Sequence, residues 1–164
     1  MKRIALALAL STACGPGSKG GPSMNNHLAP PEPVNVSSSV ISADIMAREP
    51  IANTAQVKHI LIGWKDLGES YGGRLDARAA KRTKPEAEAQ VKALLGQLKA
   101  GGDFDALMKA NSEDPGSAAT GRPFRVTPDA QLVIEFRQLS LRLKVGEIGV
   151  CESDFGFHII QRID

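Results

Sequence analysis

The chain has 164 residues, a length that favours one globular domain and allows at most two. Hydrophobic residues make up 42% of it, enough for one core, but aromatic residues make up 4%, so aliphatic side chains must fill most of that core. The formal net charge of +2 gives no electrostatic argument for a nucleic-acid-binding protein. The two cysteines, Cys14 and Cys151, are too few for a disulfide-rich scaffold or a multi-cysteine metal site.

The first thirteen residues have the pattern of a secretory signal peptide. Lys2 and Arg3 precede an apolar run over residues 4–10, and small residues follow directly before Cys14. The apolar run is too short to span a bilayer. Small residues that lead into a cysteine resemble the bacterial lipobox, although Ser11 stands where that motif prefers Leu.

The lipobox resemblance implies that Cys14 becomes the lipidated first residue of the mature chain. The protein would then be anchored at the cell envelope facing the periplasm, on the outer membrane if the cell is Gram-negative. Ordinary cleavage near Ala13 is the alternative, and it would give a secreted protein. A lipidated Cys14 cannot pair with Cys151, which we then expect to be a small buried hydrophobic residue.

Residues 14–52 are expected to form a flexible tether, and residues 53–164 the folded domain. Residues 15–39 are rich in Gly, Pro and Ser and have almost no large apolar side chain, so they cannot bury enough surface to offset the entropy of ordering. Residues 40–55 are ambiguous. Ile41, Ile45 and Met46 have partial helical spacing, but Pro50 interrupts it, so either a short helix or a loop fits.

The first half of the domain begins with a buried strand at Val57–Ile62. A glycine-rich, basic loop over residues 63–82 follows. Residues 83–86 form a capping box that begins a helix, and Gly101 and Gly102 end it. Asp103 caps a second, short helix, and residues 111–120 form a polar turn with room for one more helical turn.

The second half supplies the remaining strands. Residues 121–126 are expected to form a short strand, and residues 129–141 a helix that buries Leu132, Phe136 and Leu139. Residues 147–151 and 157–162 are two strands joined by a hairpin. The order β-α-α(-α)-β-α-β-β predicts an α+β domain with a four-stranded, mainly antiparallel sheet and three to four helices.

Four segments, in matching order and spacing, resemble the parvulin family of peptidyl-prolyl cis/trans isomerases over residues 56–164. They are Val-Lys-His-Ile-Leu-Ile at 57–62, Phe-Asp-Ala-Leu-Met-Lys-Ala-Asn-Ser-Glu-Asp-Pro at 104–115, Glu-Phe and Leu-Lys-Val-Gly-Glu-Ile within 135–148, and Ser-Asp-Phe-Gly-Phe-His-Ile-Ile at 153–160. The resemblance implies an isomerase that assists the folding of exported proteins and binds unfolded or extended chains containing proline. It implies a monomer that needs no cofactor, metal or nucleic acid. A binding module or chaperone for such peptides, with little or no turnover, is the alternative.

The family's catalytic positions fall on a small set of polar residues, namely His59, Asp114, Ser153 and His158. The two histidines either tune the group at position 114 or serve as a buried polar network that holds the sheet in register. Asp114 either lies beside the reacting amide, where burial would raise its pKa and make it a donor, or forms a turn with the following Pro-Gly.

The family's proline pocket falls on Leu132 and Phe136, which a helix would place on one face, although apolar residues at this spacing often belong to the core. The segment Gly121-Arg-Pro-Phe-Arg125 departs from the family pattern, which commonly has Leu-Gly here, and Phe124 is expected to refill the missing wall. Phe155 is a further candidate for contact with the substrate.

A basic cluster in the 63–82 loop suggests a second interpretation of specificity. It consists of Arg74, Arg78, Lys81 and Arg82. Phosphate-selective parvulins carry arginines in this loop, where guanidinium groups hold a phosphate before proline. The alternative is a solvated basic surface, as charge runs usually are.

Overall fold

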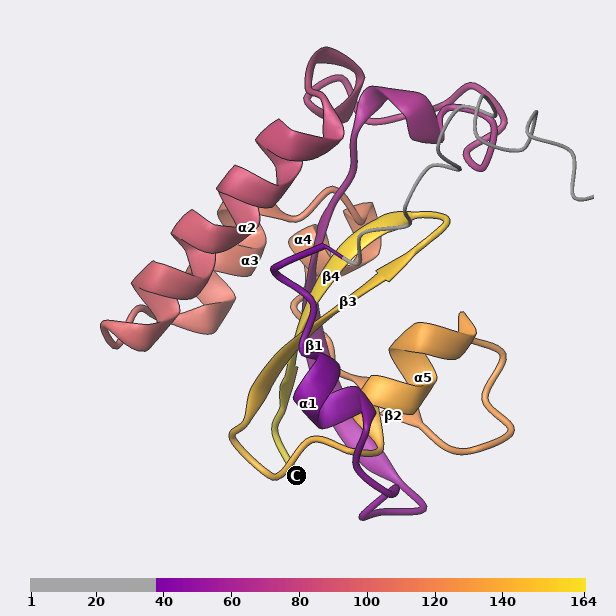
Figure 1. Ribbon diagram of the computed structural model, residues 1–164, viewed down its shortest axis with the longest axis vertical. Helices are drawn as coiled ribbons and strands as arrows, with labels where there is room; N and C mark the ends of the chain where they lie inside the picture. The colour runs from indigo at the N-terminus through magenta and orange to yellow at the C-terminus, as the bar shows by residue number, and fades with distance from the viewer. Residues whose placement is uncertain (1–37) are drawn as a thin grey trace, which may run out of the picture. The chain divides into compact units, whose positions relative to one another are not determined.

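The computed structural model describes residues 38–164; the predicted signal peptide, Cys14 and most of the predicted tether lie outside this range. Four strands form one antiparallel sheet with the order β2-β1-β4-β3 (Figure 1). Their bounds are Ala55–Ile62 for β1, Phe124–Val126 for β2, Ile148–Ser153 for β3 and Gly156–Arg162 for β4. The predicted α+β class and the antiparallel sheet are confirmed.

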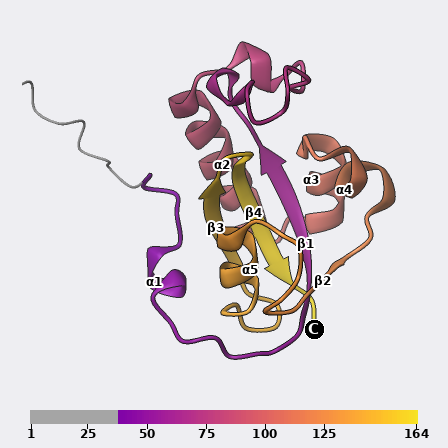
Figure 2. The same cartoon turned by 90° about the vertical axis from the view of Figure 1, so that its right-hand side faces the viewer.

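Helices cover both faces of this sheet (Figure 2). Their bounds are Ala43–Met46 for α1, Lys84–Lys99 for α2, Phe104–Asn111 for α3, Pro115–Thr120 for α4 and Ile134–Ser140 for α5. The 63–82 loop adds two 3-10 turns, Lys65–Leu67 and Ala79–Lys81. No helix within residues 38–164 is long and apolar enough to cross a bilayer.

The alternation of side chains along the strands divides the core in two. Side chains of α2 and α3 pack on one face of the sheet, against a cluster that contains Ile60, Ile62, Val150, Phe157 and Ile159. Side chains of α1 and α5 pack on the other face, with Val57, Val126, Cys151 and Ile160. Because His59 is two residues from Val57 and His158 is two residues from Ile160, both imidazoles lie on the α5 face.

Local signals place α2 and α3 where the sequence predicts them. Thr83 and Glu86 form both hydrogen bonds of the capping box at the start of α2, and Asp103 accepts from the Ala106 amide at the start of α3. Gly101, with φ of +89°, follows the end of α2 in a backbone conformation that favours glycine. The predicted helical turn after residue 111 is α4, with Asp114 as its N-cap.

The start of α5 differs from the prediction, because the helix begins at Ile134 and not near residue 129. A helix from residue 129 would use the Ala130 carbonyl to accept from the Ile134 amide. That carbonyl instead accepts from the Leu132 amide at 2.8 Å and from Arg137 Nη1 at 3.0 Å. Leu132 therefore lies in the turn before α5 and not on the helix.

Residues 38–52, which we expected in the tether, lie against the domain. Val40 and Ile45 are buried, and the Ser42 amide donates to the Val150 carbonyl at 2.9 Å along the edge of β3. Arg48 forms an ion pair with Glu147 at 2.8 Å. The folded domain thus starts earlier than residue 53, and the ambiguous Ile41–Met46 segment contains the short helix α1.

The hairpin between β3 and β4 lies close against the end of β1. Ser153 pairs with Gly156, which leaves Asp154 and Phe155 as a two-residue turn. Gly156 has φ of +129°, and a Cβ there would lie 2.6 Å from the Ile62 carbonyl oxygen. Only glycine therefore allows the hairpin to approach β1 this closely.

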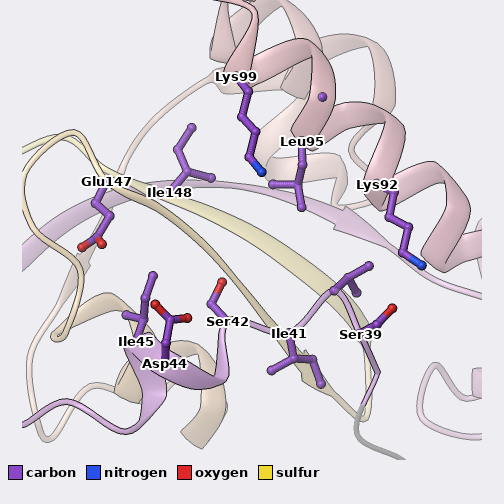
Figure 3. A pocket seen from close by; sticks show the side chains of 12 residues that line it. Ser39, Ile41, Ser42, Asp44, Ile45, Lys92, Leu95, Lys99, Glu147 and Ile148 are labelled. Carbon is purple, nitrogen blue, oxygen red and sulfur yellow. The ribbon is translucent and has the colours of Figure 1, made fainter.

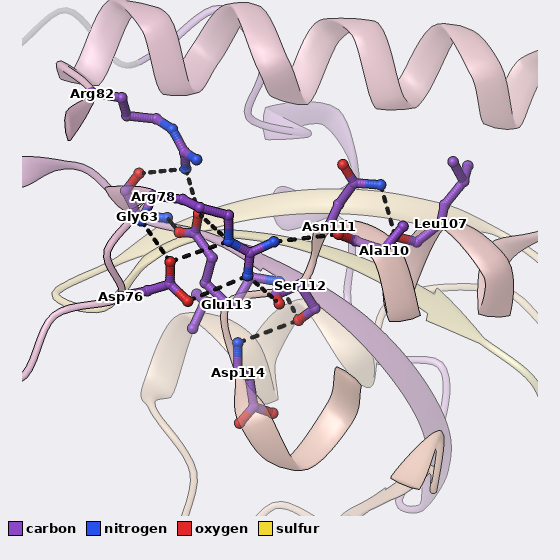
Figure 4. Close-up of polar contacts among 11 residues, drawn as sticks. Gly63, Asp76, Arg78, Arg82, Leu107, Ala110, Asn111, Ser112, Glu113 and Asp114 are labelled. Carbon is purple, nitrogen blue, oxygen red and sulfur yellow. Dashed lines mark hydrogen bonds and ion pairs between the residues drawn. The ribbon is translucent and has the colours of Figure 1, made fainter. Parts of the chain in front are cut away.

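A buried carboxylate holds the basic loop against β1 and the start of α4 (Figure 4). Glu113 Oε2 accepts from the Gly63 amide at 2.7 Å, and Glu113 Oε1 lies 2.7 Å from Arg82 Nη1. Arg82 also donates to the Gly63 carbonyl, and Arg78 donates to the Ser112 carbonyl and pairs with Asp76. The loop is therefore joined by its own arginines to the segment that carries Asp114.

Candidate active site

Two buried histidines form the centre of the site. His59 on β1 and His158 on β4 lie on the two central strands, and their Nδ1 atoms are 3.3 Å apart. The rings are stacked, with an interplanar angle of 20°. The register of the two strands produces this contact, because it pairs His59 with Ile160 and Leu61 with His158, so the histidines are diagonal neighbours on one face.

Asp114 and Ser153 lie at the two ends of the histidine pair. Asp114 Oδ2 is 3.0 Å from His59 Nε2, and Ser153 Oγ is 2.8 Å from His158 Nε2. Ser153 Oγ also accepts from the Phe155 amide at 3.1 Å. The four residues that the parvulin resemblance selected as catalytic are thus joined in one row, Asp114–His59–His158–Ser153.

Asp114 also serves as the N-cap of α4, so its turn-forming interpretation fits as well. Its carboxylate accepts from the amides of Gly116 and Ser117, both at 3.2 Å, and from the Ser117 hydroxyl at 2.5 Å. The hydrogen bond from His59, reinforced by those from Ser117, holds the pKa of the Asp114 carboxyl well below its usual range. The expectation of a raised pKa is therefore wrong: Asp114 is an ionised acceptor, because its hydrogen bonds outweigh its partial burial.

His158, unlike Asp114, is held in its uncharged form. Burial, with a smaller contribution from His59, lowers the pKa of His158 to about 3, so its imidazole is neutral at physiological pH. An ionised Asp114 can only accept, so His59 donates to it from Nε2. The neutral His158 has one ring proton, so it donates to one of its two neighbours, His59 or Ser153, and accepts from the other.

An apolar pocket of about 290 Å³ opens above this row. His59, Asp114, Phe124, Gln131, Leu132, Val133, Phe136, Phe155 and His158 line it. Phe124 and Phe136 both meet the His59 ring edge to face, with ring centroids 5.1 Å away. Phe136 and Phe124 are themselves 5.9 Å apart, so Phe124 occupies the wall that the departure at residues 121–125 was expected to open.

The core and pocket interpretations of Phe136 both apply. Its side chain is 3% exposed and packs with the α5-face cluster, yet it also lines the pocket. Leu132 lines the pocket from the preceding turn, not from the same helix face. Gln131 and Val133 were missed by sequence reasoning, because their place in the pocket depends on that turn.

The upper wall of the pocket depends on the basic loop. Phe155 is half-exposed at the hairpin turn, and Tyr71 meets its ring edge to face at 5.5 Å. The Tyr71 hydroxyl donates to the Phe155 carbonyl at 2.6 Å, and burial raises the pKa of Tyr71 to about 12. Sequence reasoning missed Tyr71, because nothing in the sequence connects residue 71 to residue 155.

Within the described part of the chain, two of the four residues in the basic cluster form ion pairs, and the other two do not. Arg78 is paired with Asp76 and Arg82 with Glu113, so the charges of both arginines are already compensated. Arg74 and Lys81 are exposed, and no acidic partner lies within ion-pair distance among residues 38–164. The cluster therefore does not form a joint four-residue anion site.

Cys151 is buried beneath α5, as predicted, and its burial raises the pKa of the thiol. Within residues 38–164, no three His, Cys, Asp or Glu side chains are placed to hold a metal ion together.

The fold and this row of residues define a parvulin-type domain, and comparisons with known proteins agree. The model of the PPIC-type PPIASE domain family matches residues 43–164. The foldase protein PrsA of Geobacillus kaustophilus is 33% identical over 111 residues, which cover 67% of this chain and 40% of that protein. A probable parvulin-type peptidyl-prolyl cis-trans isomerase of Bordetella pertussis is 30% identical over 124 residues, or 74% of this chain and 46% of that one.

A solved structure gives the same result. The crystal structure of a PpiC-type peptidyl-prolyl cis-trans isomerase domain is 25% identical and has a TM-score of 0.53, covering 68% of this chain and 89% of that one. The chain therefore belongs to the PPIC-type, or parvulin, family of peptidyl-prolyl isomerase domains. It spans less than half the length of the two curated relatives.

The buried, neutral His158 makes stability depend on pH. Its pKa is about 3 in the folded state and ~6.5 in an unfolded chain, so the unfolded state binds more protons between these values. This contribution to stability is complete above pH 6.5 and is lost as the pH falls toward 3. We expect it to lower the free energy of unfolding by about 3 kcal/mol between pH 7 and pH 4.

Urea denaturation of the wild type and of His158→Asn at both pH values measures this effect, since the other titrating groups are shared. The variant should be less stable at pH 7 but lose much less stability on acidification. Equal losses in the two proteins would contradict a neutral, buried His158.

Proposed function

We propose that this protein catalyses the cis/trans isomerisation of X-Pro bonds in unfolded or extended polypeptides, and so assists the folding of exported proteins. One observation carries the proposal: an apolar pocket of aromatic and aliphatic walls opens directly onto an ionised, hydrogen-bonded carboxylate. The foldase and isomerase names of the relatives support it.

The chemistry requires no covalent step. Rotation about the X-Pro bond is opposed because amide resonance is lost at the twisted geometry, and the barrier for peptide bonds is ~18–20 kcal/mol. Catalysis therefore consists in binding the twisted amide more tightly than either planar form. The proline ring would enter between Phe124, Leu132 and Phe136, which leaves the amide over the polar row.

Asp114 would favour the twisted form by electrostatics. In a planar amide, resonance places negative charge on the carbonyl oxygen, and twisting returns that charge to the nitrogen. A carboxylate near the oxygen repels the planar form more than the twisted one. The low pKa of Asp114 keeps this charge in place, and the histidines and Ser153 hold the carboxylate in position as a preorganised row.

A second function, binding of proline-containing chains without useful turnover, is favoured by the altered segment at residues 121–125. There Phe124 fills a wall that the family builds differently. The two functions differ in whether the pocket accelerates rotation or only holds the peptide.

Substitution of Phe136 by Ala tests the pocket. We expect kcat/KM toward a short Ala-Ala-Pro-Phe peptide to fall by about tenfold or more, because the ring that contacts both Phe124 and His59 is lost. Leu139→Ala is the matched control, since Leu139 is buried on the same helix but does not line the pocket. Phe136→Leu keeps most of the core volume if Phe136→Ala fails to fold.

The measurement is exchange between cis and trans peptide by NMR, at protein concentrations corrected for the folded fraction. Wild-type protein that binds the peptide but shows no rate above the uncatalysed one supports the binding module and rejects the enzyme. Equal rates for Leu139→Ala and both Phe136 variants would reject the pocket.

We further propose that the protein acts as a monomer at the cell envelope, anchored by a lipid on Cys14. The signal-peptide pattern supports export, and the small residues before Cys14 support lipidation. Cys14→Ser should move the protein from the membrane fraction to the soluble fraction and abolish incorporation of labelled palmitate. A Cys14→Ser protein that stays in the membrane fraction would contradict the anchor.

A further inference from the structure

A second groove, separate from the proline pocket, lies at the β3 edge of the sheet (Figure 3). It runs between α2 and the segment that leads into α1, and its volume is about 590 Å³. Leu95 and Ile148 supply apolar surface on one side, while Ser39, Ile41 and Ser42 line the other. It shares no lining residue with the pocket that contains Asp114 and Phe136.

The charge of the groove is not balanced. Lys92 and Lys99 extend from α2 into it, and neither has an acidic partner within ion-pair distance among residues 38–164. The two acidic residues of the groove, Asp44 and Glu147, are both paired with Arg48. Because one guanidinium serves both carboxylates, the groove and Arg48 together carry one net positive charge, and the two lysines, unpaired within the described residues, lie beside an apolar floor.

The helix that forms one wall has glycine at the centre of this surface. Gly96 lies inside α2, where glycine is less stable than alanine, and a Cβ at this position would meet no atom within 4 Å. No packing contact therefore requires glycine here. The consequence of Gly96 is an open surface between Lys92 and Lys99, which lie two helical turns, or roughly 10 Å, apart along the helix.

The groove also contains part of an open strand edge. The amide and carbonyl of Val150 point outward, to Ser42, so the alternation of an antiparallel strand directs those of Ile148 to the same edge. Ile148 has no backbone partner on that side within the described part of the chain. An extended peptide can use such an edge for main-chain hydrogen bonds.

We infer that this groove is a second binding site for extended, acidic and apolar segments of an unfolded polypeptide. Carboxylates of the peptide would pair with Lys92 and Lys99, and its apolar side chains would cover Leu95 and Ile148. A flat membrane surface would reach the lysines but not the recessed floor, which is why the geometry favours a peptide. The site rests on the proposed function in one respect only, that ligands of the protein are extended chains.

The test uses the full chain and a fluorescent, proline-free peptide in which Glu alternates with Val. Lys92→Gln combined with Lys99→Gln should raise its Kd about fivefold, since exposed ion pairs are individually weak. Gly96→Gln should raise the Kd at least as much by filling the groove, and should also raise the Tm because glycine is removed from a helix. Lys81→Gln with Lys109→Gln removes two exposed charges elsewhere and should leave the Kd unchanged.

Three outcomes would overturn the inference. The first is an equal loss of affinity in the Lys81/Lys109 control, and the second is full displacement of the acidic peptide by a short proline peptide. The third is a Lys92/Lys99 variant that loses binding to phosphatidylglycerol vesicles but still binds the acidic peptide as the wild type does. Isomerase rates on the short proline peptide should be the same in the Lys92/Lys99 variant and the wild type. Because the Kd of the acidic peptide is measured without turnover, failure of the isomerase proposal would not change this result.

Discussion

The antiparallel pairing of β1 with β4 is the constraint on which the site depends. Its register brings His59 and His158 together on one face of the sheet, and their Nδ1 atoms lie 3.3 Å apart. Each imidazole has two ring nitrogens, and each nitrogen here has a polar partner, so a buried pair that would otherwise be costly is fully hydrogen-bonded. The partners of the outer nitrogens, Asp114 and Ser153, are thereby held under the pocket.

This row also connects parts of the chain that are far apart in sequence. Asp114 caps α4 and accepts from His59, so the start of that helix is joined to β1. Next to it, Glu113 joins the basic loop to the same strand through Gly63 and Arg82. The site is thus preorganised by interactions of three kinds: a helix cap, a buried ion pair and a sheet register.

Much of this fold can be predicted from local signals. The capping box at Thr83 and the N-cap Asp103 each specify the start of a helix by interactions within a few residues. The site residues were found through the spacing of four motifs, and the structure brings His59, Asp114, Ser153 and His158 together. The roles of these residues in catalysis stay predictions.

The errors arise where distant contacts override local pattern. Arg137 and the Leu132 amide donate to the Ala130 carbonyl, so α5 starts later than its sequence pattern predicts. Residues that composition assigned to a tether instead form hydrogen bonds with the edge of β3. The ionisation of Asp114 could not be inferred from burial alone, since it is decided by donors from β1 and α4.

The central claim, a hydrogen-bonded row in which a neutral His158 and an ionised Asp114 lie on either side of His59, is tested most directly by ¹⁵N NMR of the two imidazoles at pH 7. The account predicts that His59 carries a proton on Nε2, toward Asp114, and that the His158 ring is uncharged. A charged His158 ring, or a His59 ring without a proton on Nε2, would contradict it.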